Sequence, residues 1–416
     1  MLTFVTFTAE SHNIVHNFMG FFTQFDHHAL AADLDVATWD SYPIGFLDSF
    51  WFPPEEKRRY ARQGHPDIAA FHHDLYRGAG RGRWWVMEQQ PGPVNWSAHN
   101  PAPLPGMVRL WTIEAAAHGA ELCSYFRWRQ APFGQEAHHA GLLRSDGAAD
   151  VGAAEASAAA ADLARLGTIG TARAPVALLL SYEASWAIET QPQGRDFRYL
   201  ELAFAFYTAL RRLGLDVDIV PPEADLAGYA LVVAPSLPLL GEALADRLAA
   251  LGVPVLFGPR TGSRTQSFQT PAALPPGPLQ RHLPLKVVRV ESLPPGLAEP
   301  GAGFAITRWL EQVDSALPAE AALADGRGIV FAAGALRYLA AWPDAALLDR
   351  LLRRMAGEAG LLLTPLPADL RLRRAEQWCF AFNYGPEPVA LAPLGLGAPL
   401  IGSDPLPPAG VACWPV

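Results

Sequence analysis

The stretch Arg83-Trp-Trp-Val-Met-Glu-Gln-Gln-Pro-Gly-Pro-Val-Asn-Trp96 joins an apolar run to a loop through one carboxylate. The run from Trp84 to Met87 predicts a buried strand, which ends at Glu88 and is followed by a Pro/Gly loop that carries Trp96. A carboxylate at the mouth of a strand, facing an indole that can stack on a sugar ring, is typical of sites that cleave glycosidic bonds. The alternative is a strand that merely ends in a polar residue, because strand ends are often polar.

The composition indicates a folded protein of two or three domains. Its 416 residues are 50% hydrophobic and 18% charged, with no compositional sign of disorder. The 32 basic and 41 acidic residues give a net charge of −9, so we expect binding neither to nucleic acid nor to an anionic membrane surface. The start of the sequence has no secretory signal, and no apolar run has the length of a membrane span.

The three cysteines are Cys123, Cys379 and Cys413. They are too few and too scattered for a disulfide framework or a zinc site. A reducing compartment is the simpler interpretation, and we therefore expect a cytoplasmic protein.

The first 145 residues alternate strands and helices. The predicted strands are Ile14–Phe18, Leu34–Trp39, Trp84–Met87 and Leu122–Arg127, and the predicted helices are His28–Asp33, Ile68–Tyr76 and Val108–His118. Such alternation indicates parallel pairing. A polar or aromatic cluster follows each strand, as at the C-terminal ends of barrel strands.

Residues 146–173 form a connector that contains an Ala-rich helix from Gly147 to Leu166. Residues 174–360 then show short apolar strands between helices, which predicts a doubly wound α/β domain. The strands are Val176–Leu180, Val217–Val220, Leu231–Ala234 and Val255–Phe257, and the clearest helices are Glu201–Leu213, Glu242–Leu251 and Ala345–Ala356. A Pro-rich passage from Pro271 to Pro294 is expected to be a long surface loop.

Residues 361–416 lose the helical pattern. Short strands separated by Pro and Gly predict a small antiparallel β domain. These strands are Leu370–Arg374, Trp378–Tyr384 and Val389–Leu391.

A series of short motifs fills the region between Asn17 and His139. In chain order they are Asn17-Phe-Met-Gly-Phe-Phe22, Leu34-Asp-Val-Ala-Thr-Trp-Asp-Ser-Tyr-Pro43, Val86-Met-Glu-Gln-Gln-Pro-Gly92, Asn95-Trp96, Pro105-Gly-Met-Val-Arg-Leu-Trp111, His118-Gly-Ala120, Tyr125-Phe-Arg-Trp-Arg-Gln130 and Glu136-Ala-His-His139. Together they resemble the glycoside hydrolase family 42 β-galactosidases. The resemblance covers essentially the whole chain, although residues 1 to about 10 match nothing in that family.

The resemblance implies a fold and an assembly. It implies a (β/α)₈ barrel, of which residues 1–145 would be the C-terminal half, strands five to eight. Residues 174–360 would be an amidotransferase-like α/β domain used for trimer assembly, and residues 361–416 the small β domain. Glutamine hydrolysis needs a thiol nucleophile, and no cysteine lies between Cys123 and Cys379. We therefore expect that domain to support a homotrimer rather than to work as an amidotransferase.

The resemblance also implies roles for single residues. Glu88 matches the catalytic nucleophile at the end of the seventh barrel strand, and Trp96 matches an aromatic residue that borders the galactose site. Glu136 and His139 match a Glu-x-x-His element that binds sugar hydroxyls beyond the eighth strand. A carboxylate can accept bonds from neighbouring hydroxyls, and an imidazole can donate or accept. The alternative for Glu136 and His139 is a solvated pair in a loop.

Other polar residues fall near the predicted strand ends. Asn17, Asp40 and Tyr42 are second-tier candidates for lining the pocket. Arg127 and Arg129 lie close to the last predicted strand of the first region, where we expect them to pair with carboxylates rather than to touch sugar.

No metal or cofactor is predicted. The adjacent histidine pairs at 27–28, 72–73 and 138–139 cannot easily chelate one ion from a regular element, and no His-Glu-x-x-His or Cys-x-x-Cys motif occurs. The family's zinc-binding cysteines belong to the barrel's N-terminal half, so nothing here matches them. The glycine-rich segment 78–82 lacks the spacing of a phosphate-binding loop.

One catalytic group has no match in this sequence. Retaining glycosidases use two carboxylates about 5–5.5 Å apart. In the family the acid/base Glu follows an Asn at the end of the fourth strand, and this sequence contains no Asn-Glu dipeptide. We therefore expect retaining hydrolysis of terminal β-galactosides through Glu88, impaired in this chain unless a separately encoded N-terminal half completes the barrel. A late start codon or a frameshifted gene would explain the short barrel. The alternatives are a non-catalytic remnant that acts in assembly, or a galactose-binding protein.

Overall fold

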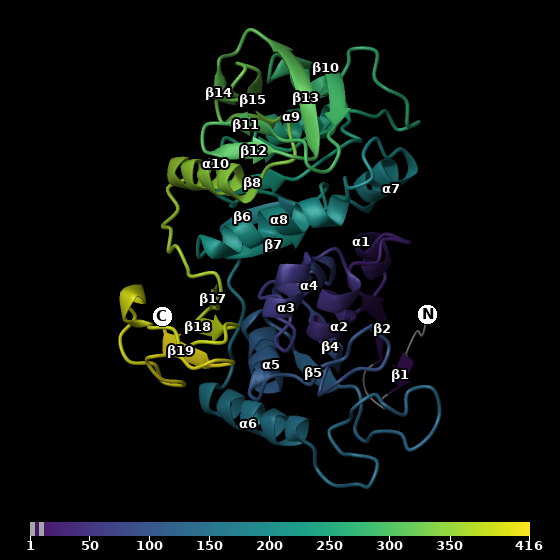
Figure 1. Ribbon diagram of the computed structural model, residues 1–416, viewed down its shortest axis with the longest axis vertical. Coiled ribbons are helices and arrows are strands. Elements are labelled where there is room, and N and C mark those ends of the chain that lie inside the picture. The colour runs from purple at the N-terminus through teal and green to yellow at the C-terminus, as the bar shows by residue number, and fades with distance from the viewer. Residues whose placement is uncertain (1–4, 8–11) are drawn as a thin grey trace. The chain divides into compact units, whose positions relative to one another are not determined.

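The computed structural model describes residues 5–7 and 12–416. The chain divides into two compact units. The first unit contains residues up to Phe22, His27–Arg173 and Thr364–Val416, and the second contains Thr23–Asp26 and Ala174–Leu363. Each unit is described by itself below, and Figure 1 labels their elements.

The first unit is built on a sheet with the order β1-β2-β3-β4-β5, counted over the described residues. Its strands are β1 (Val5–Phe7), β2 (His12–Met19), β3 (Val36–Ser41), β4 (Trp84–Gln89) and β5 (Leu122–Tyr125). Strands β2 to β5 pair in parallel, which confirms the pairing predicted from the alternation of strands and helices. Strand β1 pairs antiparallel with β2, and the sequence did not predict it.

Helices connect these strands. They are α1 (His27–Ala31), α2 (Pro43–Ser49), α3 (Pro54–Arg59), α4 (Ile68–Ala79), α5 (Met107–Ala117) and α6 (Val151–Leu166). Helices α2 and α3 were not predicted, although each begins with a proline in its first turn, where the missing N–H has no cost. Every residue of β3 is buried, as expected of a strand inside a parallel sheet covered by helices.

Three C-terminal strands belong to the first unit. Strands β17 (Leu370–Arg374), β18 (Trp378–Asn383) and β19 (Val411–Pro415) form an antiparallel sheet. The first two confirm predicted strands. The strand predicted at Val389–Leu391 is wrong, because this segment makes only an isolated bridge from Val389 to Leu406. Buried side chains of β18 and α5 share one hydrophobic core, so residues 364–416 pack within this unit.

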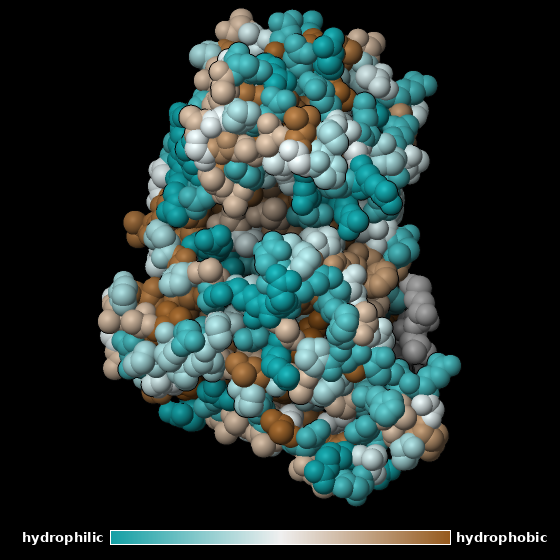
Figure 2. All heavy atoms as spheres, viewed as in Figure 1, coloured by the Kyte–Doolittle hydropathy of each residue, from teal (hydrophilic) through white to brown (hydrophobic). Residues whose placement is uncertain are grey.

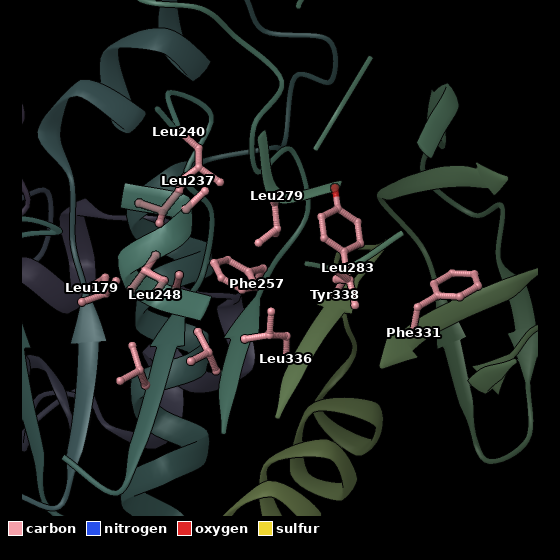
Figure 3. Close-up of a cluster of buried hydrophobic side chains, with 14 of the residues drawn as sticks. Leu179, Leu237, Leu240, Leu248, Phe257, Leu279, Leu283, Phe331, Leu336 and Tyr338 are labelled. Atoms are coloured by element: carbon pink, nitrogen blue, oxygen red, sulfur yellow. The ribbon is translucent and has the colours of Figure 1, made fainter. Parts of the chain in front are cut away.

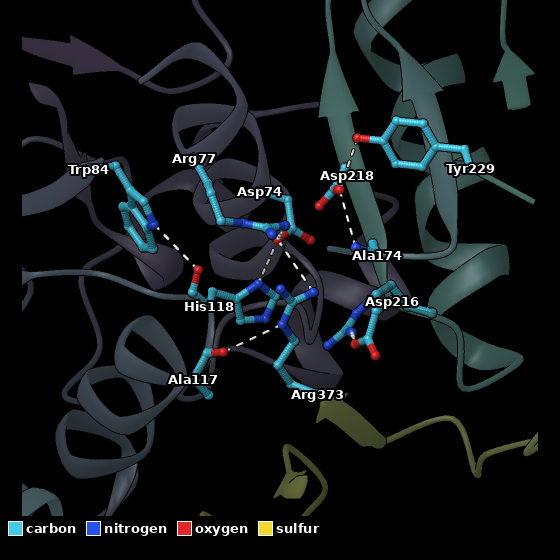
Figure 4. Close-up of polar contacts among 11 residues, drawn as sticks. Asp74, Arg77, Trp84, Ala117, His118, Ala174, Asp216, Asp218, Tyr229 and Arg373 are labelled. Atoms are coloured by element: carbon cyan, nitrogen blue, oxygen red, sulfur yellow. Dashed lines mark hydrogen bonds and ion pairs between the residues drawn. The ribbon is translucent and has the colours of Figure 1, made fainter. Parts of the chain in front are cut away.

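Buried ion pairs also join the C-terminal strands to α4. Arg371 on β17 binds both oxygens of Asp67, the N-cap residue of α4, at 2.7 Å. Figure 4 shows a second group, in which Asp74 meets His118 Nδ1 at 2.8 Å, Arg77 at 2.5 Å and Arg373 at 3.8 Å. Charges so deeply buried must be paired, which fixes how β17 meets α4.

The second unit contains a sheet with the order β14-β15-β16-β9-β8-β6-β7. Its strands are β6 (Val176–Leu179), β7 (Val217–Val220), β8 (Leu231–Ala234), β9 (Val255–Phe257), β14 (Ala319–Ala322), β15 (Gly328–Ala333) and β16 (Leu336–Leu339). The pairs β16–β9, β9–β8, β8–β6 and β6–β7 are parallel, which confirms the predicted parallel strands. The strand order reverses at β6, as in doubly wound sheets.

The helices of this unit are α7 (Tyr182–Thr190), α8 (Tyr199–Arg212), α9 (Glu242–Ala249) and α10 (Ala345–Glu358). The last three confirm predicted helices, and α7 was not predicted. Figure 3 shows side chains that fill the core on this sheet, among them Leu179, Phe257 and Tyr338. Each is fully buried, so the short apolar strands are held by packing on both faces.

The segment after β9 differs from the expectation. The passage from Pro271 to Pro294 was predicted as a surface loop, but it contains the 3₁₀ helix η1 (Gly277–Arg281) and the strand β10 (Leu285–Ser292). That prediction is wrong because the buried Leu285 and Val287 alternate with exposed residues, a strand pattern hidden by the flanking prolines. Strand β10 pairs with β13 (Trp309–Ser315), and β11 (Glu299–Gly301) pairs with β12 (Phe304–Ile306).

On the face drawn in Figure 2, hydrophilic residues predominate and hydrophobic ones are scattered among them. Among the described residues, no helix combines the length and the apolar character that crossing a bilayer requires.

Candidate active site

The candidate residues gather where three neighbouring parallel strands end. Asn17 lies near the end of β2, Asp40 near the end of β3 and Glu88 near the end of β4. The strand register sets Asp40 opposite Glu88. Since the carboxyl ends of parallel strands meet at one edge of the sheet, residues far apart in the sequence share one site.

Glu88 is partly buried and is held by a tyrosine from the next element. The hydroxyl of Tyr42, the N-cap residue of α2, donates a bond of 2.6 Å to Glu88 Oε2. Burial raises the pKa of Glu88, while the bond from Tyr42 and the charge of Arg127 oppose that rise. The Tyr42 bond fixes the orientation of the carboxylate and favours its ionised form.

Asp40 is the second carboxyl group at this edge. It is only 6% exposed, and Asn17 Nδ2 donates a bond of 2.5 Å to Asp40 Oδ1. The Thr38 hydroxyl donates to Asn17 Oδ1 at 3.3 Å and so orients the amide. Burial first, and the charge of Glu88 second, raise the pKa of Asp40 to about 8, against the effect of Asn17. Burial and the charge of Glu88 therefore favour the protonated form of Asp40.

Trp96 presents a half-exposed indole beside these groups. Its ring stands edge-on to Tyr42 at 5.6 Å between centroids, and it also contacts Phe46 at 6.1 Å. Gly45 packs closely against the indole. A Cβ at this position would come within 2.5 Å of Trp96 Cη2, so the close approach requires glycine. With 44% of the side chain exposed, the indole keeps a surface on which a sugar ring can stack.

His139 is the buried member of the Glu-x-x-His element. Its ring lies edge-on to Tyr42 at 5.7 Å and to Phe126 at 5.1 Å. Nδ1 lies 3.1 Å from the Ala140 carbonyl oxygen, whereas the buried Nε2 has no hydrogen-bond partner. Burial lowers the pKa of His139, which favours the neutral imidazole.

Glu136 lies further from the strand ends and is half exposed. It forms an ion pair with Arg127, as predicted for that arginine. The Arg127 guanidinium also stacks on Phe126 at 4.5 Å and lowers the pKa of both Glu88 and His139. Arg127 is therefore the positive charge of the site, and Glu136 joins the other candidates through it.

The structure thus brings six predicted residues into one chain of contacts, and a seventh through Arg127. The six are Asn17, Asp40, Tyr42, Glu88, Trp96 and His139. The sequence interpretation missed Gly45, Phe46 and Phe126. A glycine between the apolar Ile44 and Phe46 was the available signal for close packing at this point.

The histidine pairs lie in different surroundings. His72 is enclosed by aromatic rings such as Phe21 and Trp39, and burial lowers its pKa to about 3. Among the described residues, no three His, Cys, Asp or Glu side chains are grouped closely enough to hold a metal ion. The thiols of Cys123 and Cys413 form no disulfide bond within the described residues.

Known proteins resemble this chain over nearly its whole length. Residues 5–166 match the β-galactosidase model of glycoside hydrolase family 42, and residues 174–362 match the β-galactosidase trimerisation domain. A β-galactosidase of Thermus thermophilus is 59% identical over 406 residues, and one of a Thermus species is 61% identical over 407 residues. Both alignments cover 96% of this chain and 63% of the relative.

A solved structure agrees with these relatives. The crystal structure of a β-galactosidase from the psychrophilic Marinomonas ef1 superposes with a TM-score of 0.94 at 45% identity, over 97% of this chain and 64% of that one. This chain therefore spans less than two thirds of the length of these relatives. Both matched models describe parts of the same enzymes. The chain belongs to glycoside hydrolase family 42, the family of β-galactosidases.

Proposed function

We propose that this chain carries the nucleophile side of a retaining β-galactosidase, with Glu88 as the residue that forms the glycosyl–enzyme ester. The observation that carries the proposal is the environment of Glu88. This carboxylate stands at the end of β4, one oxygen bound by Tyr42, beside the half-exposed indole of Trp96. A carboxylate so oriented can attack the anomeric carbon of a sugar that stacks on the indole.

The neighbouring residues supply sugar contacts in this proposal. The free Nε2 of His139 and the carboxylate of Glu136 are suited to bonds with galactose hydroxyls. The orientation and charge of Glu88 are set in this proposal by three supporting residues, Asn17, Asp40 and Tyr42. The substrate class is a terminal, non-reducing β-D-galactoside.

The general acid is the group that this site lacks. Asp40 is the carboxyl group next to Glu88, but it is buried and bound to Asn17, so it does not present its proton to a leaving group. No Asn-Glu dipeptide, the family's acid/base signature, occurs in the sequence. We infer impaired turnover for residues 1–416 alone, and completion of the site by the N-terminal half of the barrel.

The architecture follows from the same inference. Strands β2 to β5 correspond to strands five to eight of a (β/α)₈ barrel, since they pair in parallel and bear the site at their carboxyl ends. The second unit corresponds to an amidotransferase-like domain that assembles a homotrimer, in keeping with its match to a trimerisation domain. We place the domain boundaries at residues 145, 173 and 360. Strands β17 to β19 form the small β domain.

Two galactosides with different leaving groups test this proposal. A dinitrophenyl galactoside needs no acid to expel its leaving group, whereas an alkyl galactoside does. We expect the chain to release dinitrophenol and to leave the alkyl galactoside intact. Glu88→Gln should abolish the release, and Glu183→Gln, which neutralises an exposed glutamate on α7, should not. Equal turnover of both galactosides would disprove the missing acid. Release that survives Glu88→Gln would disprove the nucleophile, and galactose binding without release would favour a binding protein.

A further inference from the structure

Two loops of the second unit lie at the carboxyl edge of its parallel strands. They follow β8 and β9, next to the point where the strand order reverses, which is where open α/β sheets bind ligands. The loops are held together by bonds from Gly262 N to the Leu237 carbonyl at 2.8 Å and from Leu237 N to Thr261 Oγ1 at 3.1 Å. Their backbone is therefore preorganised rather than free.

Arg260 occupies an unusual position in the second of these loops. It is 3% exposed, and its φ of 65° lies in the left-handed region that residues other than glycine seldom adopt. Its guanidinium lies 5.1 Å from the centroid of Phe197 and 5.2 Å from that of Trp309, two rings that pack edge-to-face against each other. Two aromatic faces and the loop backbone thus hold this cation in one place.

The charge of the nearby Glu311 favours the ionised form of Arg260, but this carboxylate accepts its hydrogen bonds from groups other than the guanidinium. Glu311 accepts bonds from the backbone N–H of Arg260 at 2.7 Å, from Trp309 Nε1 at 3.1 Å and from the Tyr338 hydroxyl at 2.6 Å. All three donors are neutral. Three of its acceptor sites are thus taken by groups other than the guanidinium.

A second guanidinium, that of Arg264, lies close by. Arg264 Nε donates to the side-chain oxygen of Gln191, and Arg260 Nη2 donates to the backbone oxygen of the same residue at 2.9 Å. Arg264 Nη1 donates to the Ser263 carbonyl at 2.7 Å. Each of these acceptors is neutral, and Arg260 Nη1 is buried without a hydrogen-bond partner. Burial, and next the repulsion from the charge of Arg264, lower the pKa of Arg260 to about 10, while the charge of Glu311 opposes that fall.

Another buried arginine of the same unit shows the usual arrangement. Arg337 is also 3% exposed, and it forms ion pairs with Glu320 at 2.9 Å and Glu358 at 2.7 Å. A buried charge without such a partner is costly. Within the described part of the chain, neither Arg260 nor Arg264 forms an ion pair of this kind, and Glu311 is the carboxylate whose charge acts on Arg260.

We propose that Arg260 and Arg264 form a binding site for a small oxyanion, a group with two or more charged oxygens on one centre such as a carboxylate or a phosphate. Arg260 Nη1 donates to one oxygen, and the charge of Arg264 neutralises the anion. The hydroxyls of Ser236 and Ser263, buried in the same two loops without hydrogen-bond partners, supply further donors. This site lies in the second unit and does not depend on the chemistry of Glu88.

The test uses the full chain and two probe anions. Phosphate and acetate are each titrated against chloride at matched ionic strength, with thermal unfolding and calorimetry as readouts. We expect saturable binding of one anion per chain and a higher Tm than in chloride. The anion that binds more tightly identifies the ligand class, phosphate or carboxylate.

Three variants separate a specific site from general electrostatics. Arg264→Gln removes the partly exposed cation, and Arg260→Lys keeps the charge but loses the planar fork; each should weaken binding at least tenfold. Arg247→Gln is the matched control, because Arg247 lies in the same unit and binds only backbone carbonyls, among them those of Glu223 and Ala224. Phosphate and acetate effects no larger than those of chloride would overturn the proposal. So would an affinity that Arg264→Gln and Arg260→Lys leave unchanged, or that Arg247→Gln lowers equally.

Discussion

The hydroxyl of Tyr42 donates a hydrogen bond of 2.6 Å to Glu88 Oε2, joining the start of α2 to the end of β4. This contact orients the carboxylate proposed as nucleophile and opposes the rise in its pKa that burial causes. The first prediction follows from removing it.

Tyr42→Phe deletes the donor and keeps the ring packed against Trp96. Glu88 must be ionised to attack, so a higher Glu88 pKa moves the acid limb of the pH profile to higher pH. A hydrogen bond to a charged group contributes about 1.5–3 kcal/mol, so the reaction of Glu88 with activated galactosides should slow by about 10- to 100-fold. The pH dependence of dinitrophenol release measures both effects. An acid limb that stays in place would show that Tyr42 does not tune Glu88.

Asp40→Asn should change how stability depends on pH. The pKa of Asp40 is raised in the folded state from its ordinary value of 3.8 to about 8, because burial and the charge of Glu88 favour the neutral form. The folded state therefore binds the proton more tightly, and wild-type stability falls as pH rises from about 4 to about 8. The neutral amide removes this loss, on the order of a few kcal/mol at the alkaline end.

Urea unfolding at pH 5 and pH 8 measures that difference. Relative to wild type, the unfolding free energy of Asp40→Asn should be higher at pH 8 than at pH 5. Asp33→Asn, at an exposed position of the same unit, should show no such shift. A difference between variant and wild type that does not depend on pH would contradict the assigned pKa direction.

Gly45→Ala should displace the indole of Trp96. The added Cβ would lie 2.5 Å from Cη2 and 2.7 Å from Cζ2, so the ring must move. Aromatic stacking contributes about 0.5–1.5 kcal/mol to the free energy of binding, so its loss should weaken galactose binding by roughly 2- to 10-fold. Calorimetry with galactose measures the affinity. Gly241→Ala, where a Cβ meets open space, is the control and should bind as the wild type does. An unchanged affinity for Gly45→Ala would remove Trp96 from the site.

Arg371→Met should destabilise the first unit. It leaves Asp67 buried without its partner, and breaking a buried ion pair costs about 3–5 kcal/mol. Arg59→Met breaks the more exposed pair with Asp369 and should cost about 0–1 kcal/mol. Denaturant unfolding compares the two. Equal, small effects would show that β17 does not help to hold α4 in place.

Much of the fold was predictable because its signals are local. The apolar runs at β6 to β9 and the alternation of strand and helix up to β5 depend on neighbouring residues only. The pattern failed between Pro271 and Leu339, where the longest strands, β10 and β13, mix buried with exposed polar residues and prolines precede and follow β10. Val389–Leu391 failed for a related reason, since a short apolar run with one bridging partner forms no strand.

The sequence predicted which residues belong to the candidate site but not which of them contact one another. Tyr42 and Glu88 are 46 residues apart, and their bond depends on the register of β3 and β4, which the sequence alone does not set. Likewise, the residue that links Glu136 to the other groups is Arg127, and only the folded loop after β5 reveals that connection.

Covalent trapping tests the central claim most directly. A dinitrophenyl 2-deoxy-2-fluoro-β-galactoside forms the glycosyl ester without a general acid and hydrolyses slowly, so intact-mass analysis and peptide mapping can find the labelled residue. The account predicts one fluorogalactosyl group per chain, on Glu88, and none in Glu88→Gln. A label on another carboxylate would contradict it. So would a chain that stays unlabelled whether or not galactose is present.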